Sequence, residues 1–289
     1  MRYRVQHTTI YAYARPVDLA CHMLRLQPRS LPYQQVISSS ITADPLAARR
    51  EDGVDHFGNH VSWLFLDLPH PNFSVTLDAE VEVAYPLPPD LNATPRWEDV
   101  ATARDGGPGQ WQAAEFTFPS PMVEADRDVA AYVARSFPPG RPILAALMDL
   151  LDRIRGDFKF QSGVTTISTP VGRVLAQRAG VCQDFSHLMI SGLRSLGLPA
   201  RYVSGYIRTR PPPGMVRRRG ADQSHAWVGC WLGPVHGWVD VDPTNNLIVQ
   251  DEHVVLGWGR DYGDVSPVRG VILGGGKHTL NVSVDLLPA

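Results

Sequence analysis

The feature that most constrains the fold is a run of alternating apolar and polar residues over Phe73–Tyr85. Its apolar members fall on one side of an extended strand: Val75, Leu77, Ala79, Val81, Val83 and Tyr85. A period of two is typical of an antiparallel sheet with one buried face. Glu51–Asn59 has turn chemistry and leads into a strand. Further predicted strands are Arg2–Tyr13, His22–Gln27, Gln35–Thr42 and His60–Leu68.

The composition changes after Tyr85. Residues 87–110 are rich in Pro, Gly, Asp and Ala and show no period, so we expect a linker there. Later apolar residues recur at helical spacing in Glu124–Phe137, Arg141–Phe158 and Cys182–Leu196. Strand-like segments follow at Pro199–Arg208, Val228–Leu232 and Gly237–Val241. We therefore predict an α+β chain: a β-rich N-terminal domain at 1–86, a linker at 87–110, and helices packed on an antiparallel sheet at 111–289.

Charge and hydropathy argue against several classes of protein. The 27 basic and 29 acidic side chains give a net charge of −2, which lacks the electrostatics of a nucleic-acid binder. The sequence has neither an apolar run long enough for a membrane span nor the pattern of a secretory signal. Three scattered cysteines, Cys21, Cys182 and Cys230, do not make a disulfide framework. They fit a reducing compartment, and we expect the cytoplasm.

Three short segments carry residues that suit nucleophilic catalysis. Cys182 stands at the predicted start of a helix, where the partial positive charge of the helix end favours a thiolate. His225 begins a strand, and Asp242 ends the next one before a Pro-Thr-Asn turn. Each residue alone is more often a packing residue. In this order, however, they match the nucleophile, base and orienting group of covalent catalysis.

These segments resemble the transglutaminase-like superfamily, in particular its bacterial branch. The resemblance rests on AGVCQDFSHLMISGLRSLGLPARYVSGYI, SHAWV and GWVDVDPTNN. It implies a papain-like core in which Cys182 opens a helix, His225 begins one strand and Asp242 ends the next. LRLQPR at Leu24–Arg29 and DHFGN at Asp55–Asn59 are similar to the N-terminal domain of that branch. The tail GRDYGDVSPVRGVILGGG is similar to its C-terminal segment.

One departure from the family pattern concerns the oxyanion. Animal transglutaminases use a tryptophan upstream of the cysteine, and none lies between Asp157 and Cys182 here. The backbone N–H of Cys182 can still donate to an oxyanion, and Gln161 is our candidate for a second donor. The missing tryptophan favours hydrolysis over protein cross-linking.

Several other residues compete for a role. Asp240 lies two residues before Asp242, but the family pattern selects the aspartate before Pro-Thr. Asp184 is expected to complement the helix N-terminus, and His187 to pack. Cys21 and Cys230 are expected to be buried.

No metal and no cofactor are expected. His56 and His60 lie four residues apart across a Gly-Asn turn rather than on a helix. The sequence has no Cys-x-x-Cys, no His-Glu-x-x-His and no phosphate-binding loop.

Arg208–Gly220 holds five arginines and no acidic residue. Since it links the predicted strand after the cysteine helix to the histidine strand, its ends lie near the expected site. Arg217, Arg218 and Arg219 are candidates for a rim that attracts an acidic peptide or carboxylate. A solvated connector is the alternative.

We therefore predict a thiol acyl-transfer enzyme that acts on amide bonds, with hydrolysis by a peptidase or amidase favoured. Cys182 attacks the carbonyl, His225 shuttles the proton and Asp242 orients the imidazole. Two alternatives stay open: a protein-glutamine transglutaminase, and a non-catalytic scaffold that uses the same groove. The expected partner is a peptide or protein substrate, with no nucleic acid and no membrane. The identity of the substrate and the oligomeric state stay open.

Overall fold

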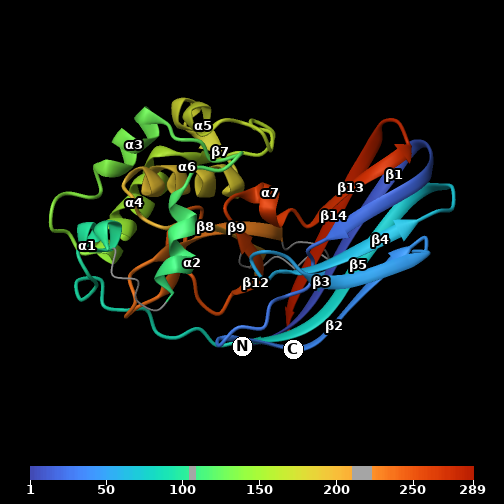
Figure 1. Cartoon of the computed structure of the whole chain (residues 1–289), viewed down its shortest axis with the longest axis horizontal. Helices are drawn as coiled ribbons and strands as arrows, with labels where there is room; N and C mark the ends of the chain where they lie inside the picture. The colour runs from blue at the N-terminus through green and yellow to red at the C-terminus, as the bar shows by residue number, and fades with distance from the viewer. Residues whose placement is uncertain (104–108, 210–222) are drawn as a thin grey trace, which may run out of the picture.

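The computed structural model describes residues 1–103, 109–209 and 223–289. Figure 1 shows two parts side by side, a long curled antiparallel sheet and a core of helices with a second sheet. Both chain ends lie at the long sheet, where the N–H of Ala289 donates to the carbonyl of Arg2 at 2.9 Å. In the described part of the chain, no helix is long and apolar enough to cross a membrane. The arrangement confirms the predicted α+β class.

The long sheet has seven strands in the order β2-β5-β1-β4-β3, with β13 and β14 also paired to β1. The first half of β1 pairs mainly with β5 and β14, and its second half with β4 and β13. In β5 every second residue from Phe73 to Val83 is buried, which confirms the predicted alternation. The bounds are β1 Arg2–Leu24, β2 Gln34–Asp44, β3 Arg49–Val54, β4 His60–Leu66, β5 His70–Val83, β13 Val268–Gly274 and β14 His278–Pro288.

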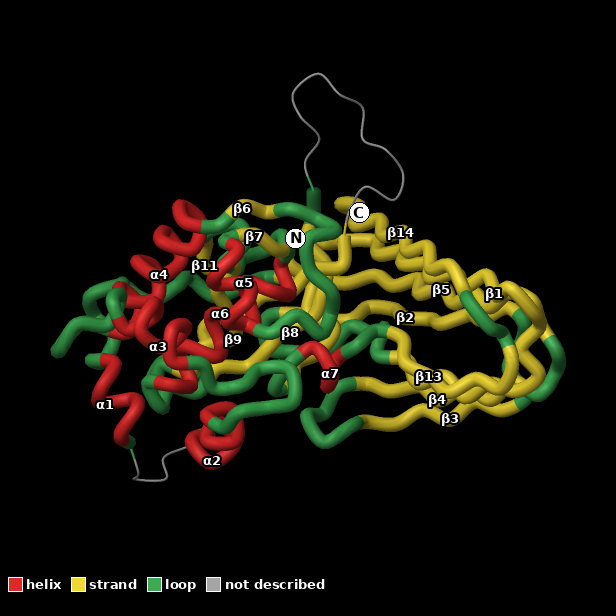
Figure 2. Tube along the Cα trace, turned by 90° about the horizontal axis from the view of Figure 1, so that it is seen from above, coloured by secondary structure: helices red, strands yellow, loops and turns green. Residues whose placement is uncertain are grey.

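This sheet differs from the sequence-based expectation in two places. Residues 51–54, expected in a turn, belong to the edge strand β3, which pairs with β4. All residues of β3 are exposed, so no buried face gives the strand an alternating pattern. The C-terminal segment was expected in the core, whereas β13 and β14 lie on β1 in the long sheet (Figure 2). The domain boundaries at residues 86 and 110 stay predictions.

The second sheet has the order β11-β10-β9-β8-β12, and every pair is antiparallel. This confirms the predicted helices on an antiparallel sheet. The strands of the core are β6 Lys159–Phe160, β7 Ala179–Gly180, β8 Ala200–Ile207, β9 Gln223–Trp231, β10 Trp238–Asp242, β11 Leu247–Ile248 and β12 His253–Gly259.

The helices cover one face of the second sheet and share an apolar core with β8, β9 and β10. The stretch predicted as a linker contains α1, whose Val100 is buried in that core. Six residues are too few to show a helical period, which explains why the sequence did not predict this helix. The helical bounds are α1 Trp97–Thr102, α2 Gln110–Ala114, the 3-10 turn Glu115–Thr117, α3 Arg127–Ala134, α4 Ile143–Asp157, α5 Val171–Gln177, α6 Cys182–Ser195 and α7 Tyr262–Val265.

The helix α6 lies at the centre of the core and begins at Cys182, as predicted. Gly197 follows its end with a φ of +79°, a conformation that glycine adopts without strain. Gly192 lets α3 approach closely, because a Cβ there would lie 2.1 Å from Cγ2 of Val133. The helix is enclosed on several sides, because its own apolar side chains are buried: Phe185, Leu188, Met189, Ile190 and Leu193.

The two N-terminal motifs join the long sheet to the core. Arg25 pairs with Asp55 at 2.9 Å, and Nη1 of Arg29 donates to Oδ1 of Asn59 at 2.6 Å. Asn59 donates to the backbone carbonyl of Trp258 in β12 and accepts from its N–H, both at 2.9 Å. The guanidinium of Arg29 lies 3.6 Å from the centre of a Trp258 ring. These contacts fix the long sheet relative to the core.

Candidate active site

Cys182 is the first residue of α6 and is half-buried. The carboxylate of Asp184 accepts hydrogen bonds from the N–H of Val181 and the hydroxyl of Thr165, both at 2.7 Å. Burial raises the pKa of Asp184. A Cβ at Gly180 would lie 2.7 Å from Oδ2 of Asp184, so this turn requires glycine. Asp184 therefore stabilises the helix start that presents Cys182, as expected.

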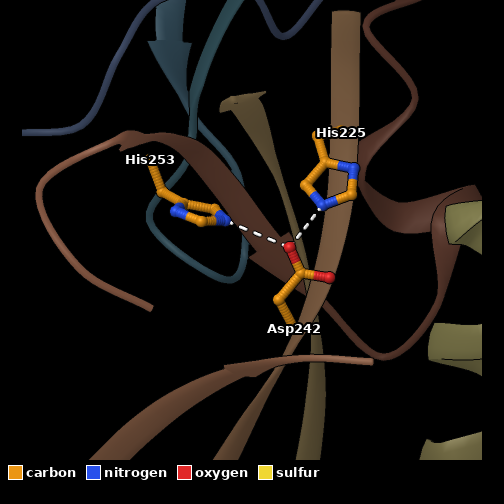
Figure 3. Close-up of side chains that lie close together, drawn as sticks. All are labelled: His225, Asp242 and His253. Carbon is orange, nitrogen blue, oxygen red and sulfur yellow. Dashed lines mark hydrogen bonds and ion pairs between the residues drawn. The ribbon is translucent and has the colours of Figure 1, made fainter. Parts of the chain in front are cut away.

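His225 and Asp242 come from the adjacent strands β9 and β10. Nε2 of His225 lies 2.7 Å from Oδ2 of Asp242, and both side chains are buried (Figure 3). The N–H groups of Thr244 and Asn245 donate to Oδ1 of Asp242 at 2.9 and 3.1 Å. The backbone of the Pro-Thr-Asn turn thus fixes the carboxylate of Asp242, and this carboxylate in turn orients the imidazole of His225.

The positive charge of His225 and the negative charge of Asp242 stabilise each other. Burial acts to raise the pKa of Asp242, but hydrogen bonds from His225 and His253 outweigh it and hold this pKa well below its usual range. Burial acts to lower the pKa of His225, but hydrogen bonds with Asp242 and Cys182 raise it to about 10. His225 and Cys182 line the same cleft, and the thiol is among the groups that raise the pKa of His225. The imidazole therefore lies near both the carboxylate and the thiol.

Two further residues hold Asp242, and sequence reasoning did not select either. His253, the first residue of β12, places Nε2 at 3.2 Å from Oδ2 of Asp242 and is 2% exposed (Figure 3). Nδ2 of Asn245 donates to the same oxygen at 2.7 Å. Asn245 lies within the DPTNN motif, which offered a local signal. His253 lies outside every motif, and only the folded sheet brings it to Asp242.

The comparisons with known proteins agree with this arrangement. The family model described as the bacterial transglutaminase-like N-terminal region matches residues 3–82, and that of the transglutaminase-like superfamily matches residues 130–243. The chain belongs to the transglutaminase-like superfamily. Uncharacterized proteins of Mycobacterium bovis (Mb2599c) and Mycobacterium tuberculosis (Rv2569c) are each 41% identical to it over 99% of this chain and 93% of their own length.

Two other similarities are partial or structural. A protein-glutamine gamma-glutamyltransferase of Pseudomonas aeruginosa is 40% identical over 68 residues, which are 23% of this chain and 10% of that protein. The crystal structure of a proposed cysteine protease from Cytophaga hutchinsonii has a TM-score of 0.75 at 20% identity, covering 100% of this chain and 91% of that one. This last match confirms the transglutaminase-like fold over the whole chain.

The residues that compete with this transglutaminase-like site have other partners. Asp240 is buried, accepts from Nε1 of Trp227 at 3.0 Å and lies 3.7 Å from Arg201. His187 is buried, and its Nε2 accepts from the N–H of Tyr262 at 3.2 Å. Asp240 and His187 are therefore tied to structural partners. Of the other cysteines, Cys230 is buried and Cys21 is half-buried.

The structure does not bring the predicted second oxyanion donor, Gln161, into the cleft. Gln161 is exposed, and its N–H donates to the carbonyl of Gly180 at 2.8 Å. Its side chain is not part of the cleft that contains Cys182. Arg217, Arg218 and Arg219 lie outside the described residues.

One cluster in the described chain has the composition of a metal site. Single donor atoms of His225, Asp242 and His253 lie within 4.8 Å of one another. Oδ2 of Asp242, however, already accepts from both imidazoles and from Asn245. A cation would have to displace these hydrogen bonds, so the set fits an orienting carboxylate better than a metal centre. The expectation of no metal stays a prediction.

A cleft of about 510 Å³ opens beside Cys182 and His225. The core contributes Tyr202, Ser204 and Tyr262 to its wall, among others. The long sheet contributes the other wall, from β1 and β14: His7, Thr9, Tyr11, Leu280, Val282 and Val284. The site therefore lies between the two parts of the molecule, and the N-terminal strands take part in it.

Proposed function

We propose that this protein is a thiol enzyme that transfers the acyl group of an amide, through Cys182, His225 and Asp242. The observation that carries the proposal is the position of His225, whose Nε2 lies 2.7 Å from Asp242 and which lines the same cleft as Cys182, a group that raises its pKa. A histidine that only fills space in the core does not require both a carboxylate and a thiol beside it. The membership of the transglutaminase-like superfamily supports the same chemistry.

The steps follow from these contacts. The protonated form of His225 stabilises the thiolate of Cys182, whose sulfur attacks the amide carbonyl carbon. The C–N bond breaks as His225 gives its proton to the leaving amine, and a thioester forms. His225 then takes a proton from water, whose oxygen attacks the thioester; the C–S bond breaks, the acid leaves, and the thiolate of Cys182 and the protonated His225 are restored. Asp242 keeps the imidazole in one orientation throughout.

The negative oxygen that forms in each attack needs hydrogen-bond donors. The N–H of Cys182 at the start of α6 supplies one. We assign the second to Tyr202 instead of Gln161. Tyr202 is 2% exposed and lines the cleft with Cys182. Burial raises the pKa of Tyr202 well above its ordinary value, and the negative charge of Cys182 adds to this rise, so the phenol keeps its proton.

Hydrolysis is the favoured fate of the thioester, because no tryptophan precedes Cys182 in the way that animal transglutaminases require. The alternative is transfer to an amine. Its support is the 40% identity over 68 residues to the Pseudomonas aeruginosa protein-glutamine gamma-glutamyltransferase. A second alternative is a scaffold that binds peptides in the cleft without chemistry. The proposed partner is a peptide or protein, with the arginines at 217–219 as a rim for acidic substrates, and the proposed compartment is the cytoplasm.

Thiol labelling tests the nucleophile. We expect iodoacetamide to alkylate Cys182 at least tenfold faster than a free cysteine at neutral pH, because a stabilised thiolate is the reactive species. The labelled position is read by peptide mass spectrometry, with Cys230→Ala as the control variant that keeps the fast site. Labelling of Cys182 no faster than that of free cysteine supports the scaffold instead.

A further inference from the structure

A second cavity adjoins the cleft beside Cys182. This second cavity has a volume of about 470 Å³ and shares Tyr11, Tyr262 and Val268 with the first. The two cavities adjoin each other beside the inner face of the long sheet, and we call them together the groove. We call the second cavity the far pocket.

Aromatic rings line the far pocket on the side of β1 and β14. Tyr11 and Tyr13 are two residues apart on β1, with ring centres 6.3 Å apart and planes 9° from parallel. His278 of β14 lies opposite Tyr13 in the strand register, 5.6 Å from the ring of Tyr11 and 6.2 Å from that of Tyr13. Apolar side chains complete much of the wall: Met122, Ile167, Val268 and Ile272.

The charge of the groove points to the kind of side chain that it binds. Among the described residues that line the two cavities, none is aspartate or glutamate, and Arg269 supplies the one arginine or lysine. A lysine or arginine of a substrate would therefore enter without a counter-charge. A large apolar or aromatic side chain would bury its surface against rings and methyl groups.

We propose that the groove holds the acyl donor as an extended peptide, and that the far pocket selects a large apolar or aromatic side chain at a distance from the amide that Cys182 attacks. The inference rests on the proposed function and gives the N-terminal sheet a role in substrate selection. In this proposal the long sheet forms the wall that contacts the substrate side chain and selects it. The contacts of Arg29 and Asn59 with Trp258 keep that wall in place.

Peptide binding to Cys182→Ala tests the far pocket without chemistry. A peptide library carries Phe, Ala or Lys at each position in turn, and its members compete with a fluorescent peptide. We expect Phe at one position to bind about tenfold more tightly than Ala, and Lys to give no gain. Adding Tyr13→Ala should remove most of the gain. Ile10→Ala, on the outer face of the same strand and 42% exposed, should keep it.

Equal binding of Phe and Ala at every position would overturn the proposal, as would a gain that survives Tyr13→Ala. If that variant does not fold, His278→Ala gives the same test from the other strand. The proposed function fails in a different way: peptides bind with the expected preference, but wild-type Cys182 forms no acyl adduct with them.

Discussion

Asp242 shows how one side chain is fixed in a single orientation at this site. Its two oxygens accept five hydrogen bonds, from two backbone N–H groups, the amide of Asn245 and the imidazoles of His225 and His253. The side chain is fully buried, so water does not compete for these bonds. A carboxylate held in this way can in turn hold the ring of His225.

Exchange of each aspartate for asparagine separates orientation from packing. Asp242→Asn should lower kcat by about three orders of magnitude, because an amide supports the wrong tautomer of His225. Asp240→Asn should lower kcat by less than tenfold, although it weakens the contact with Arg201. Steady-state kinetics of both variants, with thermal unfolding as a check of folding, measure this. Rates in the opposite order would move the orienting role to Asp240.

The pKa of His225 makes stability depend on pH in a defined direction. Folding raises this pKa from 6.5 to about 10. The stabilisation is therefore fully present below about pH 6.5 and is lost as the pH rises towards 10. We expect the difference in unfolding free energy between wild type and His225→Gln to fall across this range. Denaturant titrations at several pH values measure it, and a constant difference would contradict the ion pair.

The sequence predicted the residues of the site that stand in local motifs. Cys182, His225 and Asp242 each occupy a helix start or a strand end that can be recognised within a few residues. His253 could not be predicted, because its contact with Asp242 depends on the position of β12 across the sheet. Tyr202 lies within the long segment that carries the family resemblance, but only the folded sheet places it in the wall of the cleft with Cys182.

At the scale of elements, the packing of α6 against α3 sets where Cys182 stands. The two helices approach closely at Gly192, since a Cβ there would lie 2.1 Å from a methyl carbon of Val133. A shift of α6 would move Cys182 away from His225, which is held by a different element. The close contact therefore links helix packing to the geometry of the site.

Alanine at Gly192 tests this link. We expect Gly192→Ala to lower the free energy of unfolding by about 1–3 kcal/mol, because the core must open to admit the methyl group. Gly156→Ala in α4 is the matched control, since nothing lies within 4 Å of its Cβ. That variant should be neutral or more stable by about 0.5 kcal/mol. Equal effects in denaturant unfolding would show that the two helices do not pack as closely as described.

At the scale of the whole molecule, the last two strands of the chain pair with its first strand. β14 pairs with the first half of β1 over residues 278–288, and β13 with the second half. The sequence did not predict this, because antiparallel pairing between chain ends leaves no mark within either segment. The alternation that predicted β5 is weak in β13, where most side chains are exposed. The long sheet is therefore a product of both ends of the chain.

Two neighbouring leucines of β14 test that arrangement. Leu286 is fully buried and belongs to the core of the long sheet, whereas Leu287 is 42% exposed. Leu286→Ala should lower the free energy of unfolding by about 2–5 kcal/mol, because it removes buried methyl groups and leaves a cavity. Leu287→Ala should change it by less than about 0.5 kcal/mol. Similar losses for both variants would indicate that β14 does not join this core.

In the proposed reaction Cys182 carries the acyl group. The most direct measurement is the intact mass of the protein, quenched in acid soon after mixing with an activated acyl donor. We expect one acyl adduct, mapped to Cys182, present in Cys230→Ala and absent in Cys182→Ala. Added primary amine should leave free acid as the main product. An adduct on another residue, or none while the donor is consumed, would show that Cys182 is not the nucleophile.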